Sequence, residues 1–298
     1  MLLAVTRHPA MLIYLDNQAS VGPNSRLGLR RRKGLNENLA REILELHTLG
    51  VDGGYSQGDV IALAKMLTGW SVAGKRSSHV GRFKFNARRH EPGAKQFLEK
   101  RYPENGEEEA EQALRALANH PSTARFLATK LAGHFVADNP SADVVDQLQT
   151  KFAETGGDLG AMARELVTLS AVWDKPLSKV KSPSDLVISV LRMVGAPEKP
   201  KQMIQPLRLL GQLPFSAPSP AGWPDTAKDW INPESLLRRI ELMDLLARRR
   251  TTSQDPITLA DQAFGPVARE ETLLAIKRAP SRRAALSLLL SSPEFQRR

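Results

Sequence analysis

The stretch Leu35–Trp70, LNENLAREILELHTLGVDGGYSQGDVIALAKMLTGW, predicts two helices joined by a glycine loop and decides the fold. In its first half the apolar residues Leu39, Ile43 and Leu46 recur at the three- and four-residue spacing of an amphipathic helix. Gly50 predicts the end of that helix, because glycine adopts the left-handed conformation of a C-terminal cap at little cost. We therefore expect these two helices to form the centre of a helical core.

The second helix of the pair has a clear start signal. Ser56 followed three residues later by Asp59 is typical of an N-terminal cap with an acidic capping-box partner. A calcium-binding loop is a poorer interpretation, because the alternating oxygen ligands and the closing glutamate of such loops are missing. Asp59 is therefore predicted to be a cap.

The same stretch holds the densest set of potentially chemical side chains. Its catalytic candidates are Glu42, Glu45 and His47, and its binding candidates are Asn36, Glu37, Asn38, Arg41, Asp52 and Tyr55. Two carboxylates one turn apart beside an arginine suit a metal site or a general acid and base. They equally suit a solvent-exposed ladder of ion pairs, and for Glu37, Arg41 and Glu45 we favour that structural interpretation.

A second candidate group follows in the turn RRHEPGAK, residues 88–95. His90 and Glu91 are its catalytic candidates and Lys95 is its binding candidate, because loop residues held by a rigid scaffold commonly form sites. An ordinary solvent-exposed turn is an equal alternative.

A proline-rich segment, PSPAGWPD at residues 218–225, supplies the last candidates. Trp223 and Asp225 could bind a ligand there. We favour the simpler interpretation of a packed loop anchored by its indole ring.

Helical patterns dominate the chain and predict an all-α, irregular multi-helix domain with at most one small β-hairpin near residues 82–98. Arg82–Phe85 alternates in the manner of a strand, and Lys95–Leu98 is its expected partner. We expect a single helical domain over residues 1–298, with candidate lobes at 1–175 and 176–298. Helices are predicted near residues 107–119, 121–137, 141–154, 158–170, 182–194, 232–249, 256–278 and 281–291.

The composition excludes several kinds of site. The chain has no cysteine, which excludes disulfides, thiolate metal sites and cysteine nucleophiles. Lysine and arginine exceed aspartate and glutamate by 42 − 32 = 10, with basic clusters at Arg30–Lys33, Arg88–Arg89 and Arg248–Arg250. Nucleic acid could bind such clusters, but the aromatic content of 5% offers little for bases to stack on. We therefore favour a generally basic surface over nucleic-acid binding.

No segment predicts a membrane-spanning helix, since no run approaches the roughly 20 apolar residues required. Residues 1–15 also lack the basic start, long apolar run and cleavage site of a signal peptide. The compartment stays open, with the cytoplasm slightly favoured over the periplasm. Phosphate-binding glycine loops, GxSxG elbows and HExxH motifs do not occur, so the sequence leaves any cofactor unknown. A metal site assembled from glutamate, aspartate and histidine side chains far apart in the sequence stays an open alternative.

Five segments, in order along the chain, make it resemble a known family. They are NENLAREILELHTLGVDGGYSQGDVIALAKMLTGW, FNARRHEPGAK, HPSTARFLATKLAGHFV, PSPAGWPD and LLSSPEFQRR. Together they are similar to the signature of the bacterial family known as domain of unknown function number 1800. The resemblance implies a helical fold and no established chemistry. It also implies a further N-terminal helical region in other members, so the chain is expected to correspond to their central and C-terminal part, as if N-terminally truncated.

The resemblance also suggests a partner. In this family the gene often lies beside one for an exported, sulfatase-like family, number 1501, which makes a protein of that family a candidate partner. Three hypotheses follow, in order of preference. They are a helical scaffold or assembly protein with a protein partner, a metal-assisted or acid–base hydrolase using Glu42, Glu45, His47 and His90, and nucleic-acid binding through the basic clusters.

Overall fold

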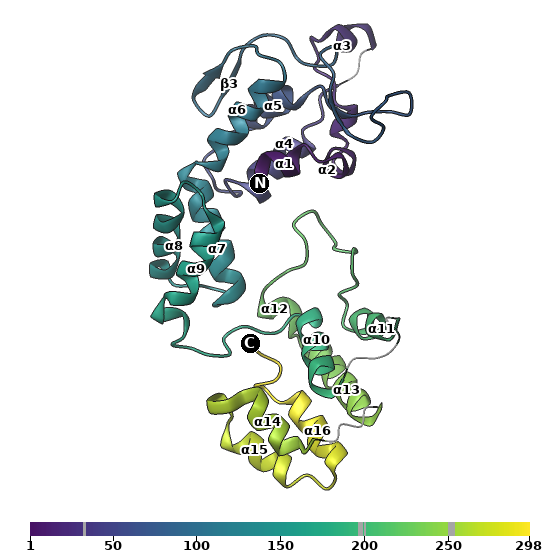
Figure 1. The fold of residues 1–298 in the computed structure, drawn as a ribbon, viewed down its shortest axis with the longest axis vertical. Coiled ribbons are helices and arrows are strands. Elements are labelled where there is room, and N and C mark those ends of the chain that lie inside the picture. The colour runs from purple at the N-terminus through teal and green to yellow at the C-terminus, as the bar shows by residue number, and fades with distance from the viewer. Residues whose placement is uncertain (32–33, 196–198, 200, 250–253) are drawn as a thin grey trace. The chain divides into compact units, whose positions relative to one another are not determined.

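The computed structural model describes residues 1–31, 34–195, 199, 201–249 and 254–298. Within these residues it contains sixteen α-helices and two small two-stranded antiparallel sheets (Figure 1). The expectation of an all-α, multi-helix protein is therefore confirmed. Among the described helices, none has the length and apolar character needed to cross a membrane.

The chain divides into two compact units. The first consists of residues 1–130 and 145–165, and the second of residues 131–144 and 166–298. Three helices have residues in both units, namely α7 (Pro121–Phe135), α8 (Ala142–Glu154) and α9 (Leu159–Thr168). The other helices of the first unit are α1 (Leu2–Thr6), α2 (Pro9–Tyr14), α3 (Arg26–Arg31), α4 (Asn38–Glu42), α5 (Gln57–Leu67) and α6 (Glu107–Ala118).

The central stretch forms the core of the first unit, as predicted. Helix α4 continues into a π-helical turn at Ile43–His47, and α5 packs against α4. Leu39, Ile43 and Leu63 are fully buried in one apolar cluster with residues of α6. Burial of apolar side chains from all three helices is the main stabilising contribution here.

The two predicted caps of the stretch differ in outcome. The first helix ends at His47 with Thr48 as its C-terminal cap, so the prediction of Gly50 as the cap was wrong by two residues. Gly50 itself has φ 83°, the left-handed conformation expected of it. The Ser56 hydroxyl accepts a hydrogen bond from the Asp59 N–H, and the Asp59 carboxylate accepts one from the Ser56 N–H, which completes the capping box at the start of α5.

The strand pairing differs from our expectation of a single hairpin. Strand β2 (Phe83–Phe85) pairs with β1 (Trp70–Val72), and β3 (Lys95–Phe97) pairs with β4 (Lys100–Tyr102). Residues 83–85 and 95–97 are extended as predicted, but the two predicted strands were wrongly paired with each other, and Leu98 lies in a turn. The second hairpin turns within Leu98 and Glu99, whose φ values of 46° and 60° are those of a type I′ turn. Its sequence lacks the Asn-Gly pair that normally indicates such a turn, which explains why we missed it.

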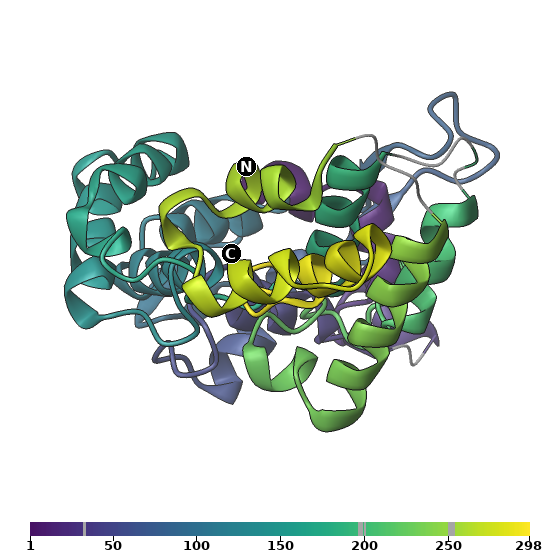
Figure 2. The same ribbon diagram turned by 90° about the horizontal axis from the view of Figure 1, so that it is seen from below.

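The second unit is a separate helical cluster. Helix α13 (Pro233–Arg249) packs along α16 (Arg282–Ser291), which also contacts α14 (Pro256–Phe264) and α15 (Glu270–Lys277) (Figure 2). A 3₁₀ turn, Gly265–Val267, separates α14 from α15 within the segment 256–278 that was predicted to be helical. Its remaining helices are α10 (Pro183–Val194), α11 (Lys201–Leu209) and α12 (Ala227–Trp230).

Candidate functional site

The ion-pair ladder favoured for the first central helix is present on the surface of the first unit. Arg41 contacts Glu37 at 3.3 Å and Glu45 at 3.2 Å, each one helical turn away. It also donates a hydrogen bond to the Gln57 amide oxygen at 3.0 Å, which links α4 to the start of α5. The Arg41 side chain is 40% exposed, so solvent screens these contacts and each contributes little to stability.

Two neighbours of this ladder have perturbed acidities. Burial raises the pKa of Glu42, the nearby Glu45 raises it further, and Arg41 partly opposes the change. Burial also raises the pKa of Tyr55, with added contributions from the charge of Glu45 and from its hydrogen bond to the phenol. A carboxyl group with a raised pKa suits a general acid, so Glu42 is the residue of this stretch best placed for proton transfer.

The amide candidates of the stretch tie it to the residues that precede it. The Asn36 N–H donates to the Ser20 hydroxyl at 3.0 Å, and its side-chain amide donates to the Leu15 carbonyl at 3.2 Å. Its side-chain oxygen accepts a hydrogen bond from the Asn38 N–H at 2.9 Å. Asp52 is exposed in the glycine loop.

His47 stands apart from these contacts. It ends the π-helical turn and is half-buried, and burial lowers its pKa. Its Nδ1 atom is buried without a hydrogen-bond partner within the described part of the chain. The residue is therefore mainly neutral at pH 7, and it lines the apolar pocket described below.

The turn at residues 88–95 is not a simple solvent-exposed turn, because it contributes to a buried ionic cluster in the first unit. Lys95 Nζ lies 2.7 Å from Glu109 Oε2, and His90 Nε2 lies 3.1 Å from Glu109 Oε1. The Glu109 side chain is fully buried, and those of His90 and Lys95 are 5% and 3% exposed. The other ring nitrogen of His90 faces the Thr68 carbonyl oxygen at 2.9 Å.

Opposing influences set the acidity of Glu109. Burial acts most strongly among the separate influences and raises its pKa. Hydrogen bonds from His90, Lys95 and the Asn105 N–H together outweigh that effect and hold the pKa below the ordinary value. Glu109 is therefore a carboxylate at neutral pH, with Lys95 as its counter-ion.

Glu91 is buried beside this cluster and also has internal partners. Its two carboxylate oxygens accept hydrogen bonds from the backbone N–H and the side-chain amide of Asn24, at 2.9 and 2.7 Å. Its own N–H donates to the Thr68 hydroxyl at 2.9 Å. A Cβ at Gly22 would come within 2.6 Å of Glu91, so glycine is needed where the two loops meet.

Sequence reasoning missed Glu109, although the sequence carried a signal for it. Glu109 lies one and two helical turns before Ala113 and Leu117, which are fully buried residues of α6. A charged residue in line with an apolar stripe is buried when the helix packs, and it then needs an ionic partner.

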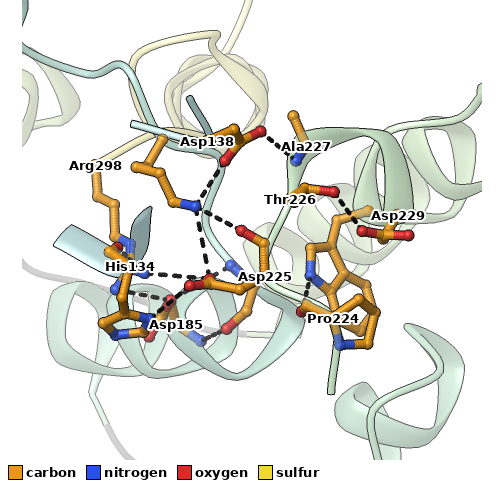
Figure 3. Close-up of polar contacts among 12 residues, drawn as sticks. His134, Asp138, Asp185, Pro224, Asp225, Thr226, Ala227, Asp229 and Arg298 are labelled. Atoms are coloured by element: carbon orange, nitrogen blue, oxygen red, sulfur yellow. Dashed lines mark hydrogen bonds and ion pairs between the residues drawn. The ribbon is translucent and has the colours of Figure 1, made fainter. Parts of the chain in front are cut away.

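A second ionic cluster lies wholly within the second unit (Figure 3). Lys179, whose side chain is 2% exposed, contacts Asp138 Oδ1 at 2.6 Å and donates to the Asp225 carbonyl. The other Asp138 oxygen accepts the Ala227 N–H at 2.7 Å. Burial raises the pKa of Asp138, but the Ala227 and Lys179 hydrogen bonds outweigh it and lower the pKa overall.

The exposed side of this cluster joins three of the quoted segments. His134 Nδ1 lies 2.7 Å from Asp225 Oδ2, and both side chains are about half exposed (48% and 42%). Arg298 contacts Asp185 at 3.2 Å and donates to the His134 carbonyl at 3.1 Å. His134, Lys179 and Arg298 were not predicted as site residues, because their partners are 41 to 164 positions away.

Trp223 packs near Trp230, with ring centroids 6.2 Å apart. The anchoring hydrogen bond of this loop comes from the Trp230 indole, which donates to the Pro224 carbonyl at 2.9 Å. The segment is therefore a packed loop, as we favoured, with Trp230 rather than Trp223 as its hydrogen-bonded anchor.

The described residues contain no group of three or more histidine, aspartate or glutamate side chains arranged to hold a metal ion. Glu42 and Glu45 lie near the surface, whereas His90 is in the buried cluster and His47 lines a pocket. Within the described part of the chain, no hydrogen bond or ion pair joins either glutamate to either histidine. The candidates are thus divided among three places.

The basic clusters are only partly covered by the structure. Arg32, Lys33 and Arg250 lie outside the described residues. In the remaining cluster, Arg89 donates a hydrogen bond to the Gln18 carbonyl and Arg88 is exposed.

Comparison with known proteins identifies a family. The model of the family described as "Protein of unknown function (DUF1800)" matches residues 1–297. A search of curated proteins and a search of solved structures each find no match.

Proposed function

The chain belongs to the DUF1800 family, and we propose that it is a helical scaffold or assembly protein that acts by binding a protein partner. The observation that carries this proposal is the internal use of the ionic side chains of its motifs. Glu91 and Lys95 are buried and already have partners within the unit, as does Glu109. Buried side chains that already have hydrogen-bond or ion-pair partners hold loops together and are poorly placed to act on a substrate.

Ionic side chains of the second unit are likewise paired with partners inside the unit. Lys179 holds Asp138 and the Asp225 backbone, so segments that are far apart in sequence are fixed side by side. Substitutions in this network would mainly change the stability of the unit. A stabilising role of this kind is what we expect of the buried polar residues of a scaffold.

An exposed aromatic residue supports a protein partner. Phe215 lies in the second unit, three residues before the proline-rich segment 218–225, is fully exposed and has φ 59°. A non-glycine residue in the left-handed region costs conformational energy, and full exposure of an aromatic ring recovers none of it. Aromatic side chains are common anchors of protein interfaces, so we place the partner's contact at Phe215.

The proposed partner is a sulfatase-like protein of family 1501. The test is isothermal titration of the purified chain with that protein, repeated with Phe215→Ser and with the control Val80→Ser. Val80 is an apolar residue in the first unit that is 59% exposed. We expect Phe215→Ser to weaken binding about tenfold or more and Val80→Ser to leave it unchanged. Absence of a complex, or equal affinity of all three proteins, would refute the proposal.

An acid–base hydrolase is the second candidate, favoured by the raised pKa of Glu42 beside Glu45. Hydrolysis of a panel of ester, glycoside and phosphate substrates that is lost in both Glu42→Gln and Glu45→Gln, without a change in melting temperature, would support this function. Activity retained in both variants would rule this pair out as the acid and base.

A further inference from the structure

A large pocket of the first unit lies beside the π-helical turn. Its volume is about 580 Å³, within the range of pockets that bind small molecules. Helices α1, α6, α7 and α9 contribute to its wall, together with the π turn and the end of α8. Its lining residues are mainly aliphatic, with one phenyl ring from Phe152; the apolar side chains include Leu3, Leu46, Leu114, Leu127 and Leu159.

The polar groups of this pocket are few and differ in availability. The hydroxyls of Thr48 and Thr123 are already used, since they donate to the Ile43 and Leu117 carbonyls at 2.7 Å. The exposed Arg115 side chain makes no hydrogen bond or ion pair with any described residue. The pocket therefore has an apolar interior and two available polar groups, the imidazole of His47 and the guanidinium of Arg115. Among the described lining residues, Arg115 supplies the one unpaired guanidinium.

A second, independent feature marks the same place. The π-helical turn adds a residue to the helix at Ile43–His47, and Thr48 follows it with φ −135° and ψ −92°, outside the regular regions. Single π-helical turns are frequent at functional sites, and backbone conformations outside the regular regions cluster there. Here the wide turn brings Leu46 and His47 to the pocket.

We propose that this pocket binds an aliphatic carboxylate, with the hydrocarbon chain among the leucines and the carboxylate at Arg115. Charge complementarity selects the anion, since Arg115 is the one side chain of fixed charge among the described lining residues. The volume suits a chain of roughly ten carbons, because ligands of that size fill pockets of a few hundred Å³. The inference is independent of the proposed partner, whose contact lies in the second unit.

Titration calorimetry with decanoate and decanol tests this proposal on the whole chain. The two ligands share a hydrocarbon chain and differ in the charged head. We expect decanoate to bind the wild-type chain about tenfold more tightly than decanol, because the guanidinium–carboxylate pair is partly exposed. Arg115→Gln should reduce that ratio to about one, whereas the control Arg101→Gln should preserve it. Arg101 is an exposed arginine on β4 of the same unit.

A filling variant tests the location of the hydrocarbon chain. Ala118→Leu adds three carbons to the wall of the pocket and should weaken both ligands about tenfold while leaving the melting temperature within a few degrees. Equal binding of decanoate and decanol by the wild-type chain would overturn the carboxylate assignment. Unchanged affinity in Ala118→Leu, or no binding of either ligand, would overturn the site itself.

Discussion

The buried cluster around Glu109 gives the sharpest stability prediction. Two unit charges 2.7 Å apart, as Lys95 Nζ and Glu109 Oε2 are, attract each other by about 6 kcal/mol at an effective dielectric constant of about 20. The loss of hydration by both ions offsets much of this attraction. Removing one member nevertheless leaves the other charge buried, and such changes cost about 3–5 kcal/mol.

We therefore expect Glu109→Gln to lower the stability of the first unit by about 3 kcal/mol. The carboxamide introduced by this substitution can still accept the Asn105 N–H, so the loss comes mainly from the stranded Lys95 ammonium, whose remaining close acceptor is the Glu91 carbonyl at 2.6 Å. Adding Lys95→Met should recover at least about 1 kcal/mol, because the unpaired charge is then gone.

Hydrogen exchange followed by mass spectrometry measures this effect unit by unit. Peptides from α6 should exchange faster in Glu109→Gln and more slowly again in the double variant, while peptides from α16 in the second unit act as an internal control. A loss below about 1 kcal/mol in α6, or a double variant less stable than Glu109→Gln, would refute the account of a stranded charge.

The same variant predicts a pH dependence. The pKa of Glu109 is held below its ordinary value of 4.5, so its carboxylate stabilises the folded chain above that pH. This contribution is lost as the pH falls through the folded-state pKa. The stability gap between the wild type and Glu109→Gln should therefore be constant near neutral pH and shrink in acid. A gap that widens in acid would contradict the direction of the shift.

Four further predictions concern other parts of the chain. Lys179→Met should destabilise the second unit by about 2 kcal/mol in urea denaturation, because the Asp138 carboxylate, which is 25% exposed, loses its charge-assisted hydrogen bond from Lys179. Ser56→Ala should cost about 1 kcal/mol by removing the capping box, measured by thermal unfolding. Glu99→Gly should stabilise the β3–β4 hairpin by about 0.5 kcal/mol, because it relieves a φ of 60°. Burial lowers the pKa of Lys181 from 10.5 to about 8, so stability should rise as the pH increases between these values and Lys181→Met should abolish that rise.

The local structure of the central stretch followed from short-range patterns. The apolar spacing of α5, its capping box and the left-handed Gly50 depend on residues within a few positions of one another, and the structure has all three. The π-helical turn at Ile43–His47 did not follow from the sequence. It depends on a hydrogen bond from the Thr48 hydroxyl to the Ile43 carbonyl and on the packing of the helix, which the apolar spacing does not specify.

The ionic clusters were predictable only in part. His90, Glu91 and Lys95 were recognised as candidates because they share a short turn, but Glu109, which pairs with His90 and Lys95, is on a helix that begins twelve residues after Lys95. In the second unit, Asp225 was recognised without its partners His134 and Lys179. Pairing of charges over long sequence separations depends on which helix faces turn inward, and that is decided by the packing of the whole unit.

The catalytic candidates are divided between a buried cluster and a surface ladder, and this affects how a loss of activity is interpreted. Loss of activity in His90→Ala would not by itself support a hydrolase, because removing the imidazole contact to Glu109 also disturbs the core of the first unit. Glu45 differs, since its contact to Arg41 is a partly exposed pair of low energy. Glu45→Gln should leave stability nearly unchanged, so a catalytic defect there would report on chemistry. Substitutions in the surface ladder, and not those in the buried cluster, therefore distinguish a scaffold from a hydrolase.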